Sequence, residues 1–297
     1  MPDPSNPTNR VMDVLNFLAA HPTERFSLAE IARHVGLSNG SAHRLLTTMA
    51  ARRFLARHER HRTYSLGLAL VAIGQAAIEQ HRGIDIARRE LARLALELGV
   101  QCSANALVDG EIVVLAREGT ARSQLGLTRV GERRPLLPPV GLCHVAWSGP
   151  AAIDTYLAAA RPHLDDALFG RLAEAIALVR RRGFAIAAKG LRAALGHDAT
   201  WLPVDQVRDA AYWNAVFAMI GQLSPGEIQA FDLAEAAAAG VSHISAPVFA
   251  PSGSVAFQLV MSGLPSDLTA GQIAGHVERL CATAAQITSE THGRAPD

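Results

Sequence analysis

Residues 26–67 carry a pattern that constrains the fold more than any other part of the chain. Ser27 followed by Glu30 has the spacing of a capping box, which predicts that a helix begins there. Gly36 can adopt the left-handed backbone that ends a helix, and Ser38 can cap the next one. The second helix then places one apolar stripe at i, i+3, i+4 and i+7: Ala42, Leu45, Leu46 and Met49. Two short helices joined by so tight a turn predict a helix-turn-helix, whose second helix can enter a DNA major groove.

The segment that follows predicts a wing, a two-stranded ribbon over residues 54–66. Its apolar positions alternate with a basic tip, and guanidinium groups suit phosphates and narrow minor grooves. His58 and His61 have a spacing that two metal ligands could share. No cysteine or carboxylate cluster completes such a site, so we expect a solvated wing, with no metal and no cofactor.

The other face of the second helix is polar, and together with the wing it forms the predicted DNA contact surface. Arg44 is the best candidate for a guanine, because its fork matches O6 and N7. The predicted DNA contacts are Ser27, Ser38, Asn39, Gly40, Ser41, His43, Arg44, Thr47, Arg57, Arg60 and Arg62.

Charge is distributed unevenly along the chain. Residues 1–82 hold ten arginines against six acidic residues, a net +4, whereas the remainder has a net −3, which together give the overall +1. A basic N-terminal part on a mildly acidic remainder indicates a nucleic-acid partner. The three cysteines have no paired spacing, and we find neither a signal peptide nor an apolar run long enough to span a membrane. We therefore expect a cytoplasmic protein.

Periodicity divides the rest of the chain into helices and strands. The helix expected near residues 68–78 is apolar and rich in small residues, so it either packs on a partner chain or joins two domains. Asp109-Gly110 between two apolar runs predicts a β-hairpin. We expect further strands at 124–130, 184–187, 241–248 and 254–262, a proline-rich loop at 135–140, and helices at 84–98, 151–160, 169–182, 205–239 and 269–290. Strands flanked by helices, with the last helix beside the first, predict an α/β sensor domain.

Catalytic chemistry finds little support in the sequence. None of the nucleophile-elbow, phosphate-loop, dinucleotide or zinc-protease motifs is present, so we predict no catalytic residue and no enzyme. Cys143 and His144 are adjacent, and adjacent side chains on one element point apart. Four aromatic residues could line a pocket, although core packing is favoured: Trp147, Trp201, Tyr212 and Trp213. The basic run 180–182 is interpreted as a solvated helix end that complements the helix dipole.

These segments, in order, resemble the isocitrate-lyase-regulator (IclR) family of bacterial transcription factors. In the N-terminal part the resemblance rests on residues 27–32, 36–38, 41–46 and 64–67. Further along it rests on residues 180–184 and on 240–249, Gly-Val-Ser-His-Ile-Ser-Ala-Pro-Val-Phe. It extends over nearly the whole length.

The resemblance implies a two-domain α+β protein, in which a winged helix-turn-helix is joined by a linker helix to a GAF-like α/β effector-binding domain. We place a disordered tail at 1–8, the DNA-binding domain at 9–67, the linker helix at 68–83 and the effector domain at 84–292. It further implies binding to double-stranded operator DNA, a small-molecule effector, and a homodimer or a dimer of dimers. The effector residues it implies are Leu127, Pro139, Val140, Gly141, Leu142, His243, Val260 and Ser262.

The chain departs from the family pattern at the implied pocket. His243 stands where the family often has cysteine, and it could contact a ligand or equally be a satisfied interior histidine. Val260 and the proline-rich loop also replace polar groups, so we expect a pocket poor in polar groups and an apolar or aromatic effector rather than a small carboxylate. The sequence thus predicts an effector-controlled transcriptional regulator. Two alternatives remain: a DNA-binding oligomer without an effector, and an enzyme with a DNA-binding head.

Overall fold

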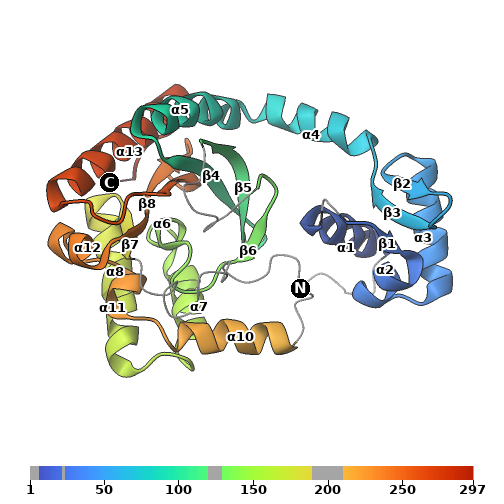
Figure 1. Cartoon of the computed structure of the whole chain (residues 1–297), viewed down its shortest axis with the longest axis horizontal. Coiled ribbons are helices and arrows are strands. Elements are labelled where there is room, and N and C mark those ends of the chain that lie inside the picture. Colours follow the sequence, from blue (N-terminus) through green and yellow to red (C-terminus); the bar gives the residue numbers. More distant parts are fainter. Residues whose placement is uncertain (1–6, 22–23, 120–128, 189–209, 297) are drawn as a thin grey trace. The chain divides into compact units, whose positions relative to one another are not determined.

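The computed structural model describes residues 7–21, 24–119, 129–188 and 210–296, and it forms two compact units (Figure 1). One unit, here called the head, ends at His81, and the other, the body, begins at Arg82. Each is described by itself.

The first three helices of the head and a small sheet pack around a core that includes Val14, Ile31, Leu46 and Leu55, none more than 2% exposed. The elements of the head are α1 (Pro7–Ala20), β1 (Phe26–Ser27), α2 (Leu28–His34), α3 (Asn39–Ala51), β2 (Leu55–His58), β3 (Thr63–Leu66) and α4 (Ala69–Gln80). α1 begins at Pro7, so residues 7 and 8 of the predicted disordered tail are helical, and residues 1–6 lie outside the described residues. Proline suits the first position of a helix, where its missing N–H is not needed.

The helix-turn-helix is confirmed in its local hydrogen bonds. The Ser27 Oγ accepts the N–H of Glu30, and the Glu30 carboxylate accepts the N–H of Ser27 at 2.7 Å. Gly36 is left-handed (φ 64°), and its N–H and that of Leu37 return to the carbonyls of Arg33 and Ala32. This pair of bonds is a Schellman motif, which ends α2 and turns the chain into α3.

The wing is also confirmed, with β2 and β3 antiparallel and Leu55 opposite Leu66. β1 adds a third strand by pairing Phe26 with Tyr64. Two residues are too few to show a strand period, which is why the sequence did not indicate β1.

α4 follows the wing and contains no buried residue. His81 alone separates α4 from the next helix, which begins at Arg82, two residues before the helix expected at 84–98. The body therefore starts on a regular helix.

The body is built on a six-stranded sheet with the order β6-β5-β4-β9-β8-β7, antiparallel throughout. Its strands are β4 (Gln101–Val108), β5 (Glu111–Glu118), β6 (Arg133–Pro135), β7 (Ala185–Ala188), β8 (Val241–Phe249) and β9 (Val255–Ser262). Its helices are α5 (Arg82–Leu98), α6 (Leu142–Val145), α7 (Pro150–Ala160), α8 (Asp166–Arg182), α10 (Ala210–Ile220), α11 (Pro225–Ile228), α12 (Leu233–Ala239) and α13 (Ala270–Glu290).

Helices α5 and α13 lie side by side over one face of this sheet (Figure 1). Alternate residues of the strands, such as Ile244 and Leu259, join Leu91 and Leu280 in one core. Ion pairs link the two helices, among them Arg89 to Glu290 at 3.0 Å. The expected return of the last helix beside the first helix of the body is confirmed.

A second core, formed mainly by helices α6, α7, α8, α10 and α11, lies apart from this one. Trp147, Tyr212 and Trp213 pack there, as favoured from the sequence, while Trp201 lies outside the described residues. The interpretation of the basic run 180–182 as a solvated helix end does not hold for Arg182. Arg182 is half-buried and donates to the carbonyls of Phe184 (2.9 Å) and Ala230 (3.1 Å), so it is a structural tie rather than a solvated residue.

Two strand predictions have different outcomes. The hairpin at Asp109-Gly110 is confirmed, with φ values of 51° and 76° and Val108 opposite Glu111. The strand predicted at 124–130 lies mostly outside the described residues. The edge strand beside β5 is β6 (Arg133–Pro135). The sequence did not predict it, because two arginines and a proline show no strand pattern.

Candidate functional site

The first candidate site is the polar face at the beginning of α3. Ser38 caps the helix by accepting the N–H of Ser41 at 3.3 Å. Arg44 Nη2 donates to the hydroxyl of Ser41 at 3.4 Å, and this long contact leaves most of the guanidinium exposed. The structure exposes Ser38, Asn39, Gly40, His43, Arg44 and Thr47, with Ser27 and Ser41 partly exposed. The predicted face is therefore accessible.

The wing presents the second group of predicted contacts. Arg57, Arg60 and Arg62 are all exposed, and Arg57 lies 6.0 Å from the ring centre of Tyr64. The rings of His58 and His61 lie 4.8 Å apart, and His58 Nδ1 accepts the N–H of His61. No group of three metal-ligating side chains occurs within the described ranges.

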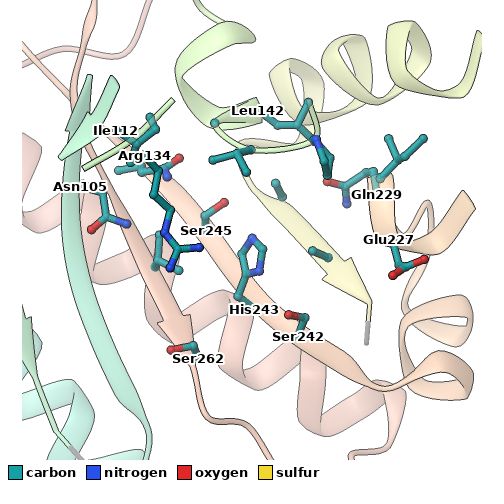
Figure 2. A pocket seen from close by; sticks show the side chains of 18 of the residues that line it. Asn105, Ile112, Arg134, Leu142, Glu227, Gln229, Ser242, His243, Ser245 and Ser262 are labelled. Carbon is teal, nitrogen blue, oxygen red and sulfur yellow. The ribbon is translucent and has the colours of Figure 1, made fainter. Parts of the chain in front are cut away.

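The second candidate site is a pocket of the body, on the sheet face opposite α5 and α13 (Figure 2). The register sets its floor as rows across β4, β9 and β8. Gln101, Ser262 and His243 form one row, Ser103, Val260 and Ser245 the next, and Asn105 with Gln258 the third. Side chains of a strand alternate between faces, so their neighbours along each strand enter the core under the helices.

The walls come from segments far apart in the sequence. Arg134 on β6, the loop at Pro139–Gly141 with Leu142 on α6, and residues 227–229 around α11 surround the floor. The empty space inside, part of it open to solvent, is about 1090 Å³.

The structure brings together nearly all the implied effector residues. Pro139, Val140, Gly141, Leu142, His243, Val260 and Ser262 line this pocket, and Leu127 lies outside the described residues. The expectation of a pocket poor in polar groups is wrong. The lining also includes Gln101, Ser103, Asn105, Arg134, Glu227, Gln229, Ser242, Ser245 and Gln258.

A buried ion pair sits at the β6 side of the pocket. Arg134 donates to one Glu132 oxygen through Nε at 3.0 Å and Nη2 at 2.7 Å, and the two residues are 7% and 1% exposed. Burial lowers the pKa of Arg134, while the Glu132 carboxylate opposes that change. The charge of this arginine is thus balanced within the protein.

Three other pocket groups are buried without full hydrogen bonding. Across the described ranges, neither side-chain polar atom of Asn105 has a partner, and the same holds for Oε1 of Gln258 and Oε1 of Glu227. Glu227 uses its other oxygen to accept the N–H of Ser224 at 2.7 Å, which caps α11. Such groups cost free energy in a closed protein interior.

Cys143 and His144 on α6 face different partners, as expected for adjacent residues. Cys143 lies against Ser245, and burial raises its pKa to about 12. His144 Nε2 lies 3.1 Å from the carbonyl of Asn105, and burial lowers its pKa to about 4. A protonated thiol and a neutral, occupied imidazole do not form a nucleophile–base pair.

Comparison with known proteins begins in the head, where the model of the IclR helix-turn-helix domain matches residues 8–59. The HTH-type transcriptional regulator KdgR of Escherichia coli is 30% identical over 142 residues, which cover 46% of this chain and 53% of KdgR. The chain thus matches about half the length of its curated relatives. Residues 8–59 are thus similar to the helix-turn-helix domain of IclR regulators. Both curated relatives are HTH-type transcriptional regulators.

Solved IclR structures share the fold over almost the full length. An IclR regulator from Alicyclobacillus acidocaldarius is 20% identical, with a TM-score of 0.68 over 96% of this chain and 98% of its own. An IclR homologue from Microbacterium hydrocarbonoxydans, described as complexed with 4-hydroxybenzoate, is 17% identical, with a TM-score of 0.65 over 95% and 98%. At this identity the likeness shows the two-domain α+β fold.

Within the residues described, no helix combines the length and the apolar character that crossing a bilayer requires.

Proposed function

We propose that this protein is a sequence-specific DNA-binding transcriptional regulator of the IclR family, and that a small molecule in the body pocket modulates its operator binding. The observation that carries the proposal is the exposed polar face of α3, set in a winged helix-turn-helix of the IclR type. This geometry suits insertion of α3 into a major groove.

The head residues divide into two roles in this proposal. Ser27, the α3 N-terminus at Ser38 and Gly40, and the wing arginines at 57, 60 and 62 hold phosphates, since N–H groups and guanidinium forks bind anions. Bases are read by some of the other exposed residues, with Arg44 on guanine. The group from which the base contacts come is Asn39, Ser41, His43, Arg44 and Thr47.

The effector occupies the body pocket in this proposal, with contacts from the loop at 139–142 and from His243, Val260 and Ser262. Two observations support an effector over a purely oligomeric body. The pocket holds buried polar atoms without partners among the described residues, and a protein of the same fold is described with 4-hydroxybenzoate bound. Ligand control then requires different affinities for two arrangements of the dimer.

Catalysis in the body is disfavoured by the same geometry. Cys143 and His144, the adjacent pair that might suggest a nucleophile and base, are both buried and held in unreactive protonation states. We therefore propose a binding protein rather than an enzyme.

Helix α4 supports self-association. It buries no residue of its own, and Leu68, Val71 and Ile73 are 84%, 67% and 51% exposed. Apolar surface of this kind usually marks an interface. We propose that residues 68–83 serve as linker and dimer contact between a DNA-binding domain at 9–67 and an effector domain at 84–292, in a cytoplasmic dimer or dimer of dimers.

Fluorescence anisotropy tests the DNA-binding proposal directly. Purified protein is titrated onto DNA from upstream of its own gene and onto random DNA, across a range of salt concentrations. We expect selective binding with a steep salt dependence, because several phosphates are neutralised. Equal affinity for a library of genomic fragments and for random DNA would refute sequence-specific regulation.

A further inference from the structure

The polar groups that lack partners around the body pocket lie in two clusters. Asn105 and Gln258 are 1% and 6% exposed, and Glu227 is also 6% exposed. Figure 2 shows Asn105 and Glu227 on opposite sides of the cavity, with His243 between them. Asn105 lies on β4, whereas Glu227 lies on α11, which packs against β7, three strands away in the sheet order. A ligand that satisfies both clusters must therefore be elongated.

The cluster on β4 and β9 offers an amide edge. Asn105 and Gln258 are direct cross-strand neighbours on the pocket face of the sheet. A register shift between Ala104 and Asn105 marks the β5 side of β4, and the buried ring of His144 holds the Asn105 carbonyl at 3.1 Å. Asn105 presents both a donor and an acceptor without partners in the described chain, and Gln258 presents an acceptor. A ligand group that donates and accepts at once, such as a carboxamide, matches this edge.

The cluster at α11 consists of the Glu227 carboxylate, a negatively charged hydrogen-bond acceptor. One oxygen of Glu227 caps the helix, and within the described residues the other has neither a hydrogen bond nor an ion pair. A buried carboxylate in this state calls for a donor, and a cation satisfies it best. An ammonium group on the ligand would supply both.

The arginine of the pocket does not shift this balance toward an acidic ligand. Arg134 is neutralised by the buried carboxylate of Glu132, so a ligand carboxylate would have to compete with that ion pair. With Glu227 counted, the charged groups that line or support the cavity sum to a negative value.

We infer that the pocket selects an elongated molecule with an ammonium group against Glu227 and a carboxamide-like group against Asn105 and Gln258, in preference to a carboxylic acid. This inference rests on the proposed effector function and specifies its ligand class.

Isothermal titration calorimetry on the full-length protein tests the inference with defined probes. These are ω-amino amides with two to six methylene groups, the ω-hydroxy amides and dicarboxylic acids of matching length, and 4-hydroxybenzoate. We expect at least one amino amide to bind at least tenfold more tightly than its hydroxy and diacid counterparts. Glu227→Gln should abolish that preference, while Glu174→Gln, an exposed change on α8, should preserve it.

A second variant guards against a folding artefact at Glu227. Asn105→Leu should raise the melting temperature of the ligand-free protein, because it removes two buried atoms without partners, and it should weaken amino amide binding at least tenfold. A lower melting temperature would show that Asn105 serves the fold and would overturn the amide end of the inference.

Other results contradict the inference without touching the proposed function. If every amino amide fails to bind, or if an acid binds more tightly than all of them, the ligand class is wrong. Anisotropy on DNA separates the two levels, since an acid that changes selective DNA binding leaves the regulator proposal standing. Loss of DNA selectivity in all conditions would instead remove the regulator proposal, while calorimetry still reports what the pocket binds.

Discussion

The head and the body present their polar groups in opposite ways. In the head, Ser38 and Arg44 lie on an exposed helix, and their geometry depends on residues within a few positions of them. In the body, Asn105 and Glu227 are buried in a cavity whose walls come from strands and helices more than a hundred residues apart. A DNA-binding surface must be accessible to a large partner, whereas a ligand pocket must exclude water around a small molecule. Exposed polar groups of the head therefore cost little folding free energy, whereas buried polar groups of the pocket cost more.

The largest effects should come from the core of the head and from the body core under α5 and α13, and each should stay within its own unit. Leu46 is fully buried in the head core and Leu259 in the core under α5 and α13. Leu→Ala at either position should cost roughly 2–5 kcal/mol, from lost burial and the cavity left behind. Denaturant unfolding, with DNA binding and pocket ligand binding as two separate readouts, measures which unit loses stability. Leu46→Ala should remove DNA binding and spare the pocket, and Leu259→Ala should do the reverse; a loss of both functions from each change would show that the units unfold together.

Acid should destabilise the body through His144. Burial lowers the pKa of His144 to about 4 from 6.5, so below pH 6.5 the unfolded chain takes up a proton that the folded body refuses. The stability present above pH 6.5 is lost progressively as the pH falls toward 4, by about 3 kcal/mol. Urea unfolding at several pH values should show this slope, and His144→Gln should flatten it. An unchanged slope in the variant would assign the acid sensitivity to other groups.

Base recognition by Arg44 and phosphate binding by Arg60 should differ in how DNA affinity depends on base sequence and on salt concentration. Arg44→Ala should weaken specific binding by roughly 1–3 kcal/mol and relax base preference, because a base contact is lost. Arg60→Ala should weaken binding to all sequences alike. It should also reduce the slope of log K against log salt concentration by about 0.9, the value for one phosphate contact. Anisotropy on operator and random DNA distinguishes them. Equal losses for Arg44→Ala on both DNAs would remove it from base recognition, and an unchanged salt slope would remove Arg60 from the phosphates.

The same contrast explains what the sequence could predict. The capping box, the Schellman turn and the α3 stripe depend on residues close together in the sequence, so the helix-turn-helix and the wing were predicted, whereas β1 was not. The pocket was predicted only where the family resemblance pointed, at residues 139–142, 243, 260 and 262. Alternation on β4 and β9 could have indicated Gln101, Ser103 and Gln258, since polar residues there alternate with core ones. Arg134 and Glu227 could not be found in this way, because a three-residue strand and a single helical turn show no period.

The smallest expected effect compares two helix caps that are alike in chemistry and different in setting. Ser38 caps α3 and Asp165 caps α8, each accepting the N–H three residues on, at 3.3 Å and 2.8 Å. Ser38→Ala and Asp165→Ala should each cost about 1 kcal/mol of stability, the usual value of a cap. Only Ser38→Ala should also weaken DNA binding, because the α3 N-terminus then loses the hydroxyl that orders it beside a phosphate. Thermal unfolding and anisotropy measure the two quantities on the same samples. If Ser38→Ala lost stability and kept full DNA affinity, the turn before α3 would serve only the fold, and the phosphate contact would have to come from the wing alone.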